Sequence, residues 1–139
     1  MDTKNGILFC CRFEEASNPL DAMAHLKTNK WLYWSVGYPI RKDRLLLLPI
    51  IGLMHMTKDR VRYKCIIKEV KVYEPSDHLD SSKKPESWIR KQKENPRIYK
   101  STMIFEQIEP FDYDTRELKG LNGQRIKNPP RGYQKIILP

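Results

Sequence analysis

The segment Arg60–Val72 reads RVRYKCIIKEVKV, and its alternation is the clearest indication of fold class in the chain. Alternate residues from Val61 to Ile67 are apolar or aromatic, which is typical of a β-strand with one buried face. The phase slips by one residue at Lys68-Glu69 and resumes at Val70. Such a slip indicates a β-bulge, which bends a strand. The segment therefore predicts one long, bent strand of a curved sheet.

Apolar runs and turn residues on either side predict the other elements. The expected strands are 6–13, 45–50, 99–108 and 134–138, and the expected helices are 18–27 and 85–93. Polar composition predicts a loop over 76–84, a hairpin loop over 54–59, a break at Glu109-Pro110 and a tight turn at Asn122-Gly123. Five or six strands with two or three short helices predict a small mixed α+β fold, a bulged barrel, formed by a single domain over 1–139.

Composition limits the classes of partner. The chain has 139 residues and a formal charge of +9, from 26 Lys and Arg against 17 Asp and Glu. This excess favours nucleic acid as partner, then an anionic membrane surface, with solubility alone as the alternative. The longest apolar run, Leu45–Met54, is too short to cross a bilayer, which takes ~20 residues. The N-terminus has no signal-peptide pattern, and three cysteines without CxxC spacing are typical of reduced thiols, so we expect a cytoplasmic protein.

The segment Lys30–Tyr38 reads KWLYWSVGY and carries four aromatic rings. Aromatic rings beside lysines and arginines favour a site that stacks an unpaired nucleobase and neutralises its phosphates. The alternative is that the rings are core, because aromatic side chains bury large areas. The candidate base-stacking rings are Trp31, Tyr33, Trp34 and, later in the chain, Trp88.

Clusters of basic residues are the candidate phosphate contacts, with solvated turns as the alternative. They are Arg41, Lys42 and Arg44, then Arg90, Lys91, Lys93 and Arg97, then Arg125 and Lys127.

Signals for catalysis are weak. The three histidines lack the spacing of metal ligands, and no glycine motif for phosphate binding is present. The run Asp77-His78-Leu79-Asp80 is interpreted as a solvated loop because prolines and serines flank it. We therefore expect no enzyme activity, no cofactor and no bound metal.

The order of elements resembles the PUA-like superfamily and, within it, the YTH and EVE domains. The matching parts are the strand Ile7–Phe13, the helix Asn18–Lys27, the Trp34-Ser35 pair and the ending Leu121–Ile126 with Tyr133–Pro139. The charged turn and leucines of Arg41–Leu47 are similar to the EVE pattern. The resemblance implies a PUA-like barrel that encloses one modified base between aromatic rings. It implies Trp34 and Trp88 as cage walls, Trp31 and Tyr33 as substitutes, and Ser35 as a polar contact to the base.

Such domains also resemble the N-terminal specificity modules of archaeal McrB-type restriction systems, which read methylated DNA. The resemblance therefore implies a reader of a flipped, methylated base, with N6-methyladenine in DNA favoured and RNA possible. It also implies an associated NTPase or nuclease. The alternatives are an RNA-binding PUA or ASCH-like module and a protein-interaction domain without a nucleic-acid ligand.

Overall fold

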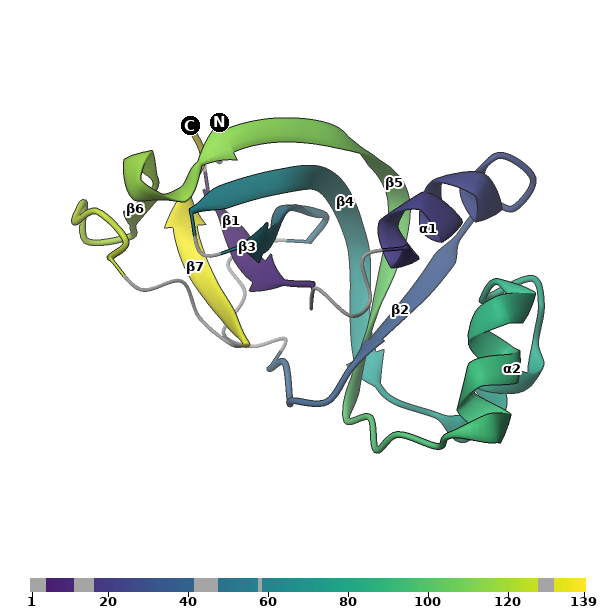
Figure 1. The fold of residues 1–139 in the computed structure, drawn as a ribbon. Helices are drawn as coiled ribbons and strands as arrows, with labels where there is room; N and C mark the ends of the chain where they lie inside the picture. The colour runs from purple at the N-terminus through teal and green to yellow at the C-terminus, as the bar shows by residue number, and fades with distance from the viewer. Residues whose placement is uncertain (1–4, 12–16, 42–47, 58, 128–131) are drawn as a thin grey trace.

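The computed structural model describes residues 5–11, 17–41, 48–57, 59–127 and 132–139, which form one sheet with two α-helices (Figure 1). Lys42 and Arg44 lie outside these residues. The elements are β1 (Asn5–Cys10), α1 (Asn18–Leu26), β2 (Leu32–Val36), β3 (Ile50–Thr57), β4 (Arg60–Val72), the 3-10 helix η3 (Pro75–Leu79), α2 (Glu86–Glu94), β5 (Ser101–Asp114), the 3-10 helix η4 (Thr115–Glu117), β6 (Lys119–Gly120) and β7 (Tyr133–Ile137).

The mixed α+β class is confirmed, but the described strands do not close into the predicted bulged barrel. The described strands form one seven-stranded sheet in the order β2-β5-β4-β3-β1-β7-β6, so β2 and β6 are its two edges. Among the described strands, β1 and β3 are the one parallel pair. The outer edge of β2 is partly covered, because the Tyr33 N–H donates to the Lys83 carbonyl at 2.8 Å. β6 is two residues long and, among the strands, pairs with β7. So short an edge strand offers few backbone hydrogen bonds that could close the sheet into a barrel.

The predicted bulge in β4 is confirmed. The register between β4 and β5 shifts between Ile66 and Ile67 and again between Ile67 and Glu69. Ile67 and Val70 are three residues apart, so in a regular strand their side chains would point to opposite faces. Both are buried, because the bulge turns the side chain of Val70 back to the inner face. Figure 1 shows β4 and β5 as long, curved neighbouring strands of the sheet.

Two predicted interruptions are wrong. β3 continues to Thr57 through the expected hairpin loop, and β5 runs through Glu109-Pro110 to Asp114. Pro110 lies opposite Tyr63, beside another register shift. A proline has no N–H to donate, so it is tolerated at such an irregular position. The turn at Asn122-Gly123 is confirmed, with Gly123 at a φ of 82°.

β1 contributes to two hydrophobic clusters, as expected of a central strand. Phe9 packs with Trp34 and Phe105 in the larger cluster, and Leu8 belongs to a smaller one with Ile136. Both predicted helices are confirmed, although α1 has Ser17 rather than Asn18 as N-cap. Cys11 and Cys65 are buried and Cys10 is half-buried.

Candidate nucleic-acid interface and a buried lysine cluster

β2 has two faces because successive side chains of a strand point to opposite sides. Leu32, Trp34 and Val36 are buried, whereas Tyr33 and Ser35 are half-buried. Trp31 directly precedes the strand, is half-buried, and by its spacing shares the face of Tyr33. The aromatic segment is therefore divided between the core and an outer face.

Trp34 lies on the inner face and is only 5% exposed. Its ring stacks on Phe105 at 5.4 Å and meets the Trp88 ring edge-to-face at 5.5 Å. Trp88 is half-buried, and its Nε1–H donates to Asp21 Oδ2 at 3.2 Å. The structure thus brings the two predicted cage tryptophans together, but they pack on each other. A base could reach Trp34 only after these rings separated.

Trp31 lies on the outer face and is bordered by two lysines. Lys68 Nζ lies 3.8 Å from the centre of its ring, and Lys30 Nζ lies 5.0 Å away. No carboxylate within the described residues forms an ion pair with either ammonium group. The half-buried Trp31 ring therefore lies beside two exposed lysines whose charges remain available to an anion.

Tyr33, two residues after Trp31, also has two lysines near its ring. Lys71 Nζ and Lys83 Nζ lie 5.0 and 5.2 Å from the centre of its ring. Both of these lysines also form ion pairs with the buried carboxylate of Asp77. The lysine–aromatic face, as we name it, consists of Trp31 and Tyr33 with Lys30, Lys68, Lys71 and Lys83.

Ser35, the next outward residue, belongs to a chain of polar contacts that we name the Lys84 cluster. Lys84 Nζ donates to Ser35 Oγ at 2.6 Å, and Ser35 Oγ lies 2.9 Å from Thr102 Oγ1. On its other side, Lys84 Nζ lies 3.1 Å from His78 Nε2. His78 Nδ1 in turn lies 2.7 Å from the Tyr73 hydroxyl. The cluster therefore contains Ser35, Tyr73, His78, Lys84 and Thr102.

Lys84 is 1% exposed, although lysine is rarely buried without a carboxylate partner. Its Nζ instead lies 5.7 and 5.5 Å from the ring centres of Tyr73 and Tyr99. Burial lowers the pKa of Lys84 to about 7, against an attraction from nearby Asp77. At neutral pH both the ammonium and the free amine are therefore populated.

His78 is also buried, and burial together with the Lys84 charge lowers its pKa to about 4. The imidazole is therefore neutral at pH 7. When Lys84 is charged it can only donate, so His78 Nε2 must accept and Nδ1–H must donate to the Tyr73 hydroxyl. The protonation of Lys84 thus sets the direction of the hydrogen bonds along the cluster.

The interpretation of Asp77-His78 as a solvated loop is wrong. Asp77 is 0% exposed and accepts from Lys83 Nζ at 3.1 Å, and Lys71 Nζ lies 3.0 Å from its second oxygen. Pro75 begins η3, which turns both residues inward over the outer face of the sheet. Alternation cannot reveal such burial, because the segment is neither a strand nor a long helix. The one sequence signal was a pair of titratable residues, Asp77-His78, that begins two positions after Pro75.

The predicted phosphate contacts are exposed wherever the structure describes them. Arg90, Lys91 and Lys93 lie on α2, none of whose residues is buried, and Arg97 follows it. Arg41 is exposed at the end of the segment after β2. Arg125 and Lys127 are exposed at the other end of the sheet.

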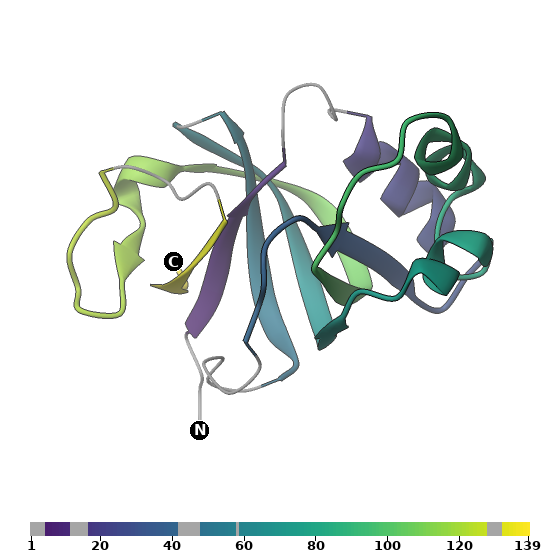
Figure 2. The same cartoon turned by 90° about the horizontal axis from the view of Figure 1, so that it is seen from below.

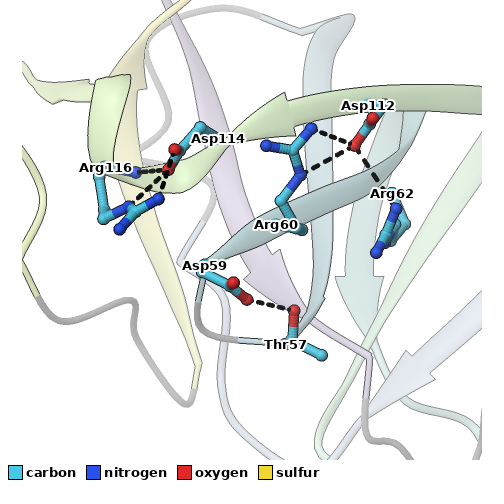
Figure 3. Close-up of polar contacts among 7 residues, drawn as sticks. All are labelled: Thr57, Asp59, Arg60, Arg62, Asp112, Asp114 and Arg116. Carbon is cyan, nitrogen blue, oxygen red and sulfur yellow. Dashed lines mark hydrogen bonds and ion pairs between the residues drawn. The ribbon is translucent and has the colours of Figure 1, made fainter.

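Other arginines of the chain are engaged in ion pairs. Figure 3 shows Arg60 donating to Asp112 through Nε at 3.0 Å and lying 2.8 Å from it through Nη2, with Arg62 at 3.5 Å. Arg116 pairs with Asp114 within one turn. That hydrogen bonding lowers the pKa of Asp114 to about 2. These guanidinium groups are partly neutralised, so they are weaker candidates for phosphate contact than Lys30 or Lys68.

No group of three or more His, Cys, Asp or Glu side chains is placed to hold a metal ion in the described ranges. The helices of those ranges are all too short or too polar to span a membrane. Comparisons of the chain with protein-family models, with curated proteins and with solved structures found no match. The functional inference therefore depends on the chain's own geometry and chemistry.

Proposed function

We propose that the protein binds nucleic acid on the lysine–aromatic face, with an unpaired or flipped base stacked on Trp31. The observation that carries this proposal is the half-buried Trp31 ring with Lys68 Nζ at 3.8 Å and Lys30 Nζ at 5.0 Å. A base takes the place of the ammonium over the ring, and the displaced lysine contacts the adjacent phosphate. The charge of +9 supports an anionic polymer as the ligand.

The energies favour this exchange. An exposed cation–π contact contributes about 0.5–1 kcal/mol. Stacking of a base on an aromatic side chain contributes about 1–3 kcal/mol. The lysine that leaves the ring keeps its charge and releases a counterion from the phosphate it meets. Arg90, Lys91 and Lys93 on the exposed surface of α2 add charge of the same sign.

A finer proposal follows from the resemblance to YTH and EVE domains. The stacked base is methylated, with N6-methyladenine in DNA favoured, and the protein serves as the specificity module of a cytoplasmic restriction system beside an NTPase or nuclease. An extra methyl group adds apolar burial of about 0.8 kcal/mol. In this form of the proposal the base does not stack on Trp31 but enters between Trp34 and Trp88, which separate to admit it.

The test is a fluorescence titration of labelled oligonucleotides with the Trp31→Ala variant. We expect about a tenfold loss of affinity, in keeping with the loss of one stacked base. Phe111→Ala is the matched control, because Phe111 also carries a lysine over its ring, Lys64 at 5.2 Å, on a different part of the sheet. Equal effects of the two variants would contradict the proposal.

The lysines are tested by the salt dependence of the same titration. Lys30→Gln and Lys68→Gln are each expected to reduce the slope of log affinity against log salt by about 0.7–0.9 per lost phosphate contact. Arg116→Gln is the control, because Arg116 is already paired with Asp114. An unchanged slope in both lysine variants would exclude these lysines from the interface.

Matched DNA and RNA strands, with and without N6-methyladenine, 5-methylcytosine or N4-methylcytosine, test the finer proposal. Preference for one modified DNA supports the restriction reader, and preference for unmodified RNA supports the PUA or ASCH-like alternative. Absence of binding to every strand would leave the protein-interaction alternative.

A second candidate function, acyl transfer, is favoured by the 2.6 Å contact between Ser35 Oγ and Lys84 Nζ. A buried lysine with a pKa of about 7 is a suitable general base for a serine hydroxyl. The Lys84 amine takes the Ser35 proton as Oγ bonds to the carbonyl carbon of an ester. The ester C–O bond then breaks, the leaving alcohol takes that proton, and water hydrolyses the acyl group from Ser35.

The test of this second candidate is intact-protein mass spectrometry after treatment with a fluorophosphonate. Covalent labelling that is lost in Ser35→Ala and in Lys84→Met would support it. Absence of labelling in the unaltered protein would exclude Ser35 as an activated nucleophile.

A further inference from the structure

A hollow of about 600 Å³ lies between the loop that follows β6 and strand β7. Figures 1 and 2 both place β6 and its loop at the end of the molecule opposite α2. The hollow is therefore separate from the Lys84 cluster and from the cations of α2. Its volume lies within the range of about 300–1,000 Å³ that is usual for small-molecule sites.

Short-range hydrogen bonds fix the wall of the hollow. The Gly120 N–H donates to the Gln124 carbonyl and the Gly123 N–H donates to the Gly120 carbonyl, both at 2.9 Å. The Gln124 N–H donates to Asn122 Oδ1 at 3.1 Å. Ile126 is 5% exposed, and its N–H donates to Leu118 at 3.0 Å. The loop is thus anchored at both ends, and the lining side chains project from a defined backbone.

The lining combines carboxamides with cations. Asn122, Gln124 and Gln134 contribute side-chain amides, and Arg125 and Lys127 contribute positive charge. Within the described residues, the side-chain amides of Gln124 and Gln134 have no hydrogen-bond partner. Lys127 likewise has no ion-pair partner there, whereas Arg125 has a long contact of 3.6 Å with Glu117. These groups can therefore bond to a ligand without first breaking strong contacts.

This combination selects a class of ligand. Each carboxamide offers a donor and an acceptor, the pattern that reads the edge of a nucleobase. Two cations, with no carboxylate among the described lining residues, favour a phosphate and disfavour a metal ion. Among the described residues that line the hollow there is no aromatic ring and Ile126 is the one large apolar side chain, so these residues do not favour a purely hydrophobic ligand.

We propose that this hollow binds a nucleotide, with Arg125 and Lys127 on the phosphate and the carboxamides of Gln124 and Gln134 on the edge of the base. The choice of nucleotide over another phosphorylated compound rests on the proposed nucleic-acid function. The nucleotide is either free or part of a bound strand, and the chemistry of recognition is the same.

Gly120 keeps the hollow open. A Cβ at this position would lie 3.3 Å from Asn122 Oδ1 and 3.5 Å from Gln134 Nε2. An alanine is nearly accommodated, but a larger side chain would project among the carboxamides. Gly120→Leu is therefore a steric block of the proposed site.

The experiment is isothermal titration calorimetry with the four ribonucleoside 5′-monophosphates, inorganic phosphate and a short single-stranded oligonucleotide. The unaltered protein is expected to bind at least one nucleotide about tenfold more tightly than inorganic phosphate, because the base adds hydrogen bonds. The double variant Arg125→Gln with Lys127→Gln should weaken the binding of every nucleotide about tenfold or more. Gln134→Leu should change the preference among bases, and Gly120→Leu should abolish binding.

Lys135→Gln is the matched control, because Lys135 is the next residue of β7 and points to the other face of the strand. It should leave nucleotide affinity unchanged. Binding of the oligonucleotide but not of monophosphates, with the same sensitivity to Gln134→Leu, would identify a nucleotide within a strand as the ligand. Nucleotide affinity no higher than that of phosphate, or equal in all variants, would overturn the inference.

The Trp31→Ala variant separates this inference from the proposed function. If the variants of residues that line the hollow do not change nucleotide affinity while Trp31→Ala weakens oligonucleotide binding, the inference about the hollow fails and the proposed function stands. If monophosphates bind in the hollow while Trp31→Ala has no effect on any strand, the proposed function fails and the hollow is a nucleotide site by itself.

Discussion

The two faces of β2 carry neighbouring residues of one aromatic segment and give them different environments. On the inner face, Trp34 is 5% exposed and packs on Phe105 and Trp88. On the outer face, Trp31 is half-buried and has Lys30 and Lys68 over its ring. The comparison shows that aromatic content alone does not locate a binding surface, because the strand period divides the rings.

The outer face also differs in its polar chemistry. Lys84 is buried against Ser35 and His78, whereas Lys68 is free to meet an anion over Trp31. Two lysines of one face thus have different roles: one belongs to a closed polar cluster and the other to an accessible surface.

Trp34→Ala tests the inner face and has the largest expected effect. Loss of a large buried ring should lower the free energy of unfolding by about 3–5 kcal/mol. Urea denaturation followed by circular dichroism measures it, and Trp34→Phe should give a smaller loss. A loss below about 1 kcal/mol would show that Trp34 is not a core residue.

Lys84→Met tests the buried part of the outer face. The pKa of Lys84 falls from 10.5 to about 7 on folding, so above pH 7 the unfolded chain binds more protons. Stability should therefore rise by about 1–2 kcal/mol from pH 7 to 8.5 in the unaltered protein. Above that range the buried thiols of Cys11 and Cys65, whose pKa values are raised, oppose the trend.

The rise should be absent in Lys84→Met, because the titrating amine is gone. Lys83→Met is the control, since the Asp77 hydrogen bond raises the pKa of Lys83 and keeps it charged throughout this range. Denaturation at several pH values measures the slopes. If stability still rises with pH in Lys84→Met, another titrating group causes the rise.

The Arg60–Asp112 pair of Figure 3 shows what an ion pair contributes where both partners meet water. A double-mutant cycle with Arg60→Ala and Asp112→Ala should give a coupling energy of about 0.2–1 kcal/mol, and less in high salt. A larger coupling would mean that this pair, and not only the Lys84 cluster, holds the sheet together.

Trp31→Ala has a much smaller expected effect on stability than Trp34→Ala. A half-buried ring with two lysine neighbours should change the free energy of unfolding by about 1 kcal/mol. The same urea titration that serves for Trp34→Ala measures this change. A loss as large as that of Trp34→Ala would remove the distinction between the faces, and with it the basis for a binding role of Trp31.

Patterns within one element were predicted well. The bulge at Lys68-Glu69, the helix start near Pro19 and the turn at Gly123 all follow from local rules of period and backbone conformation. The passage of β5 through Pro110 was missed, because a register shift with β4 accommodates the missing N–H. The burial of Asp77 and His78 was missed for a related reason: a 3-10 helix has too few residues to show a period.

The sequence by itself determined the mixed α+β class, the long bent strand, the two helices and the excess of positive charge, since these depend on residue order and composition. Only the tertiary structure decided that the described strands form an open sheet, that Trp34 is buried whereas Trp31 is half-buried, and that Lys84 reaches Ser35 across 49 positions of the chain. These outcomes depend on which strands pair and which loop covers an edge, and contacts between distant segments leave no mark in local periodicity.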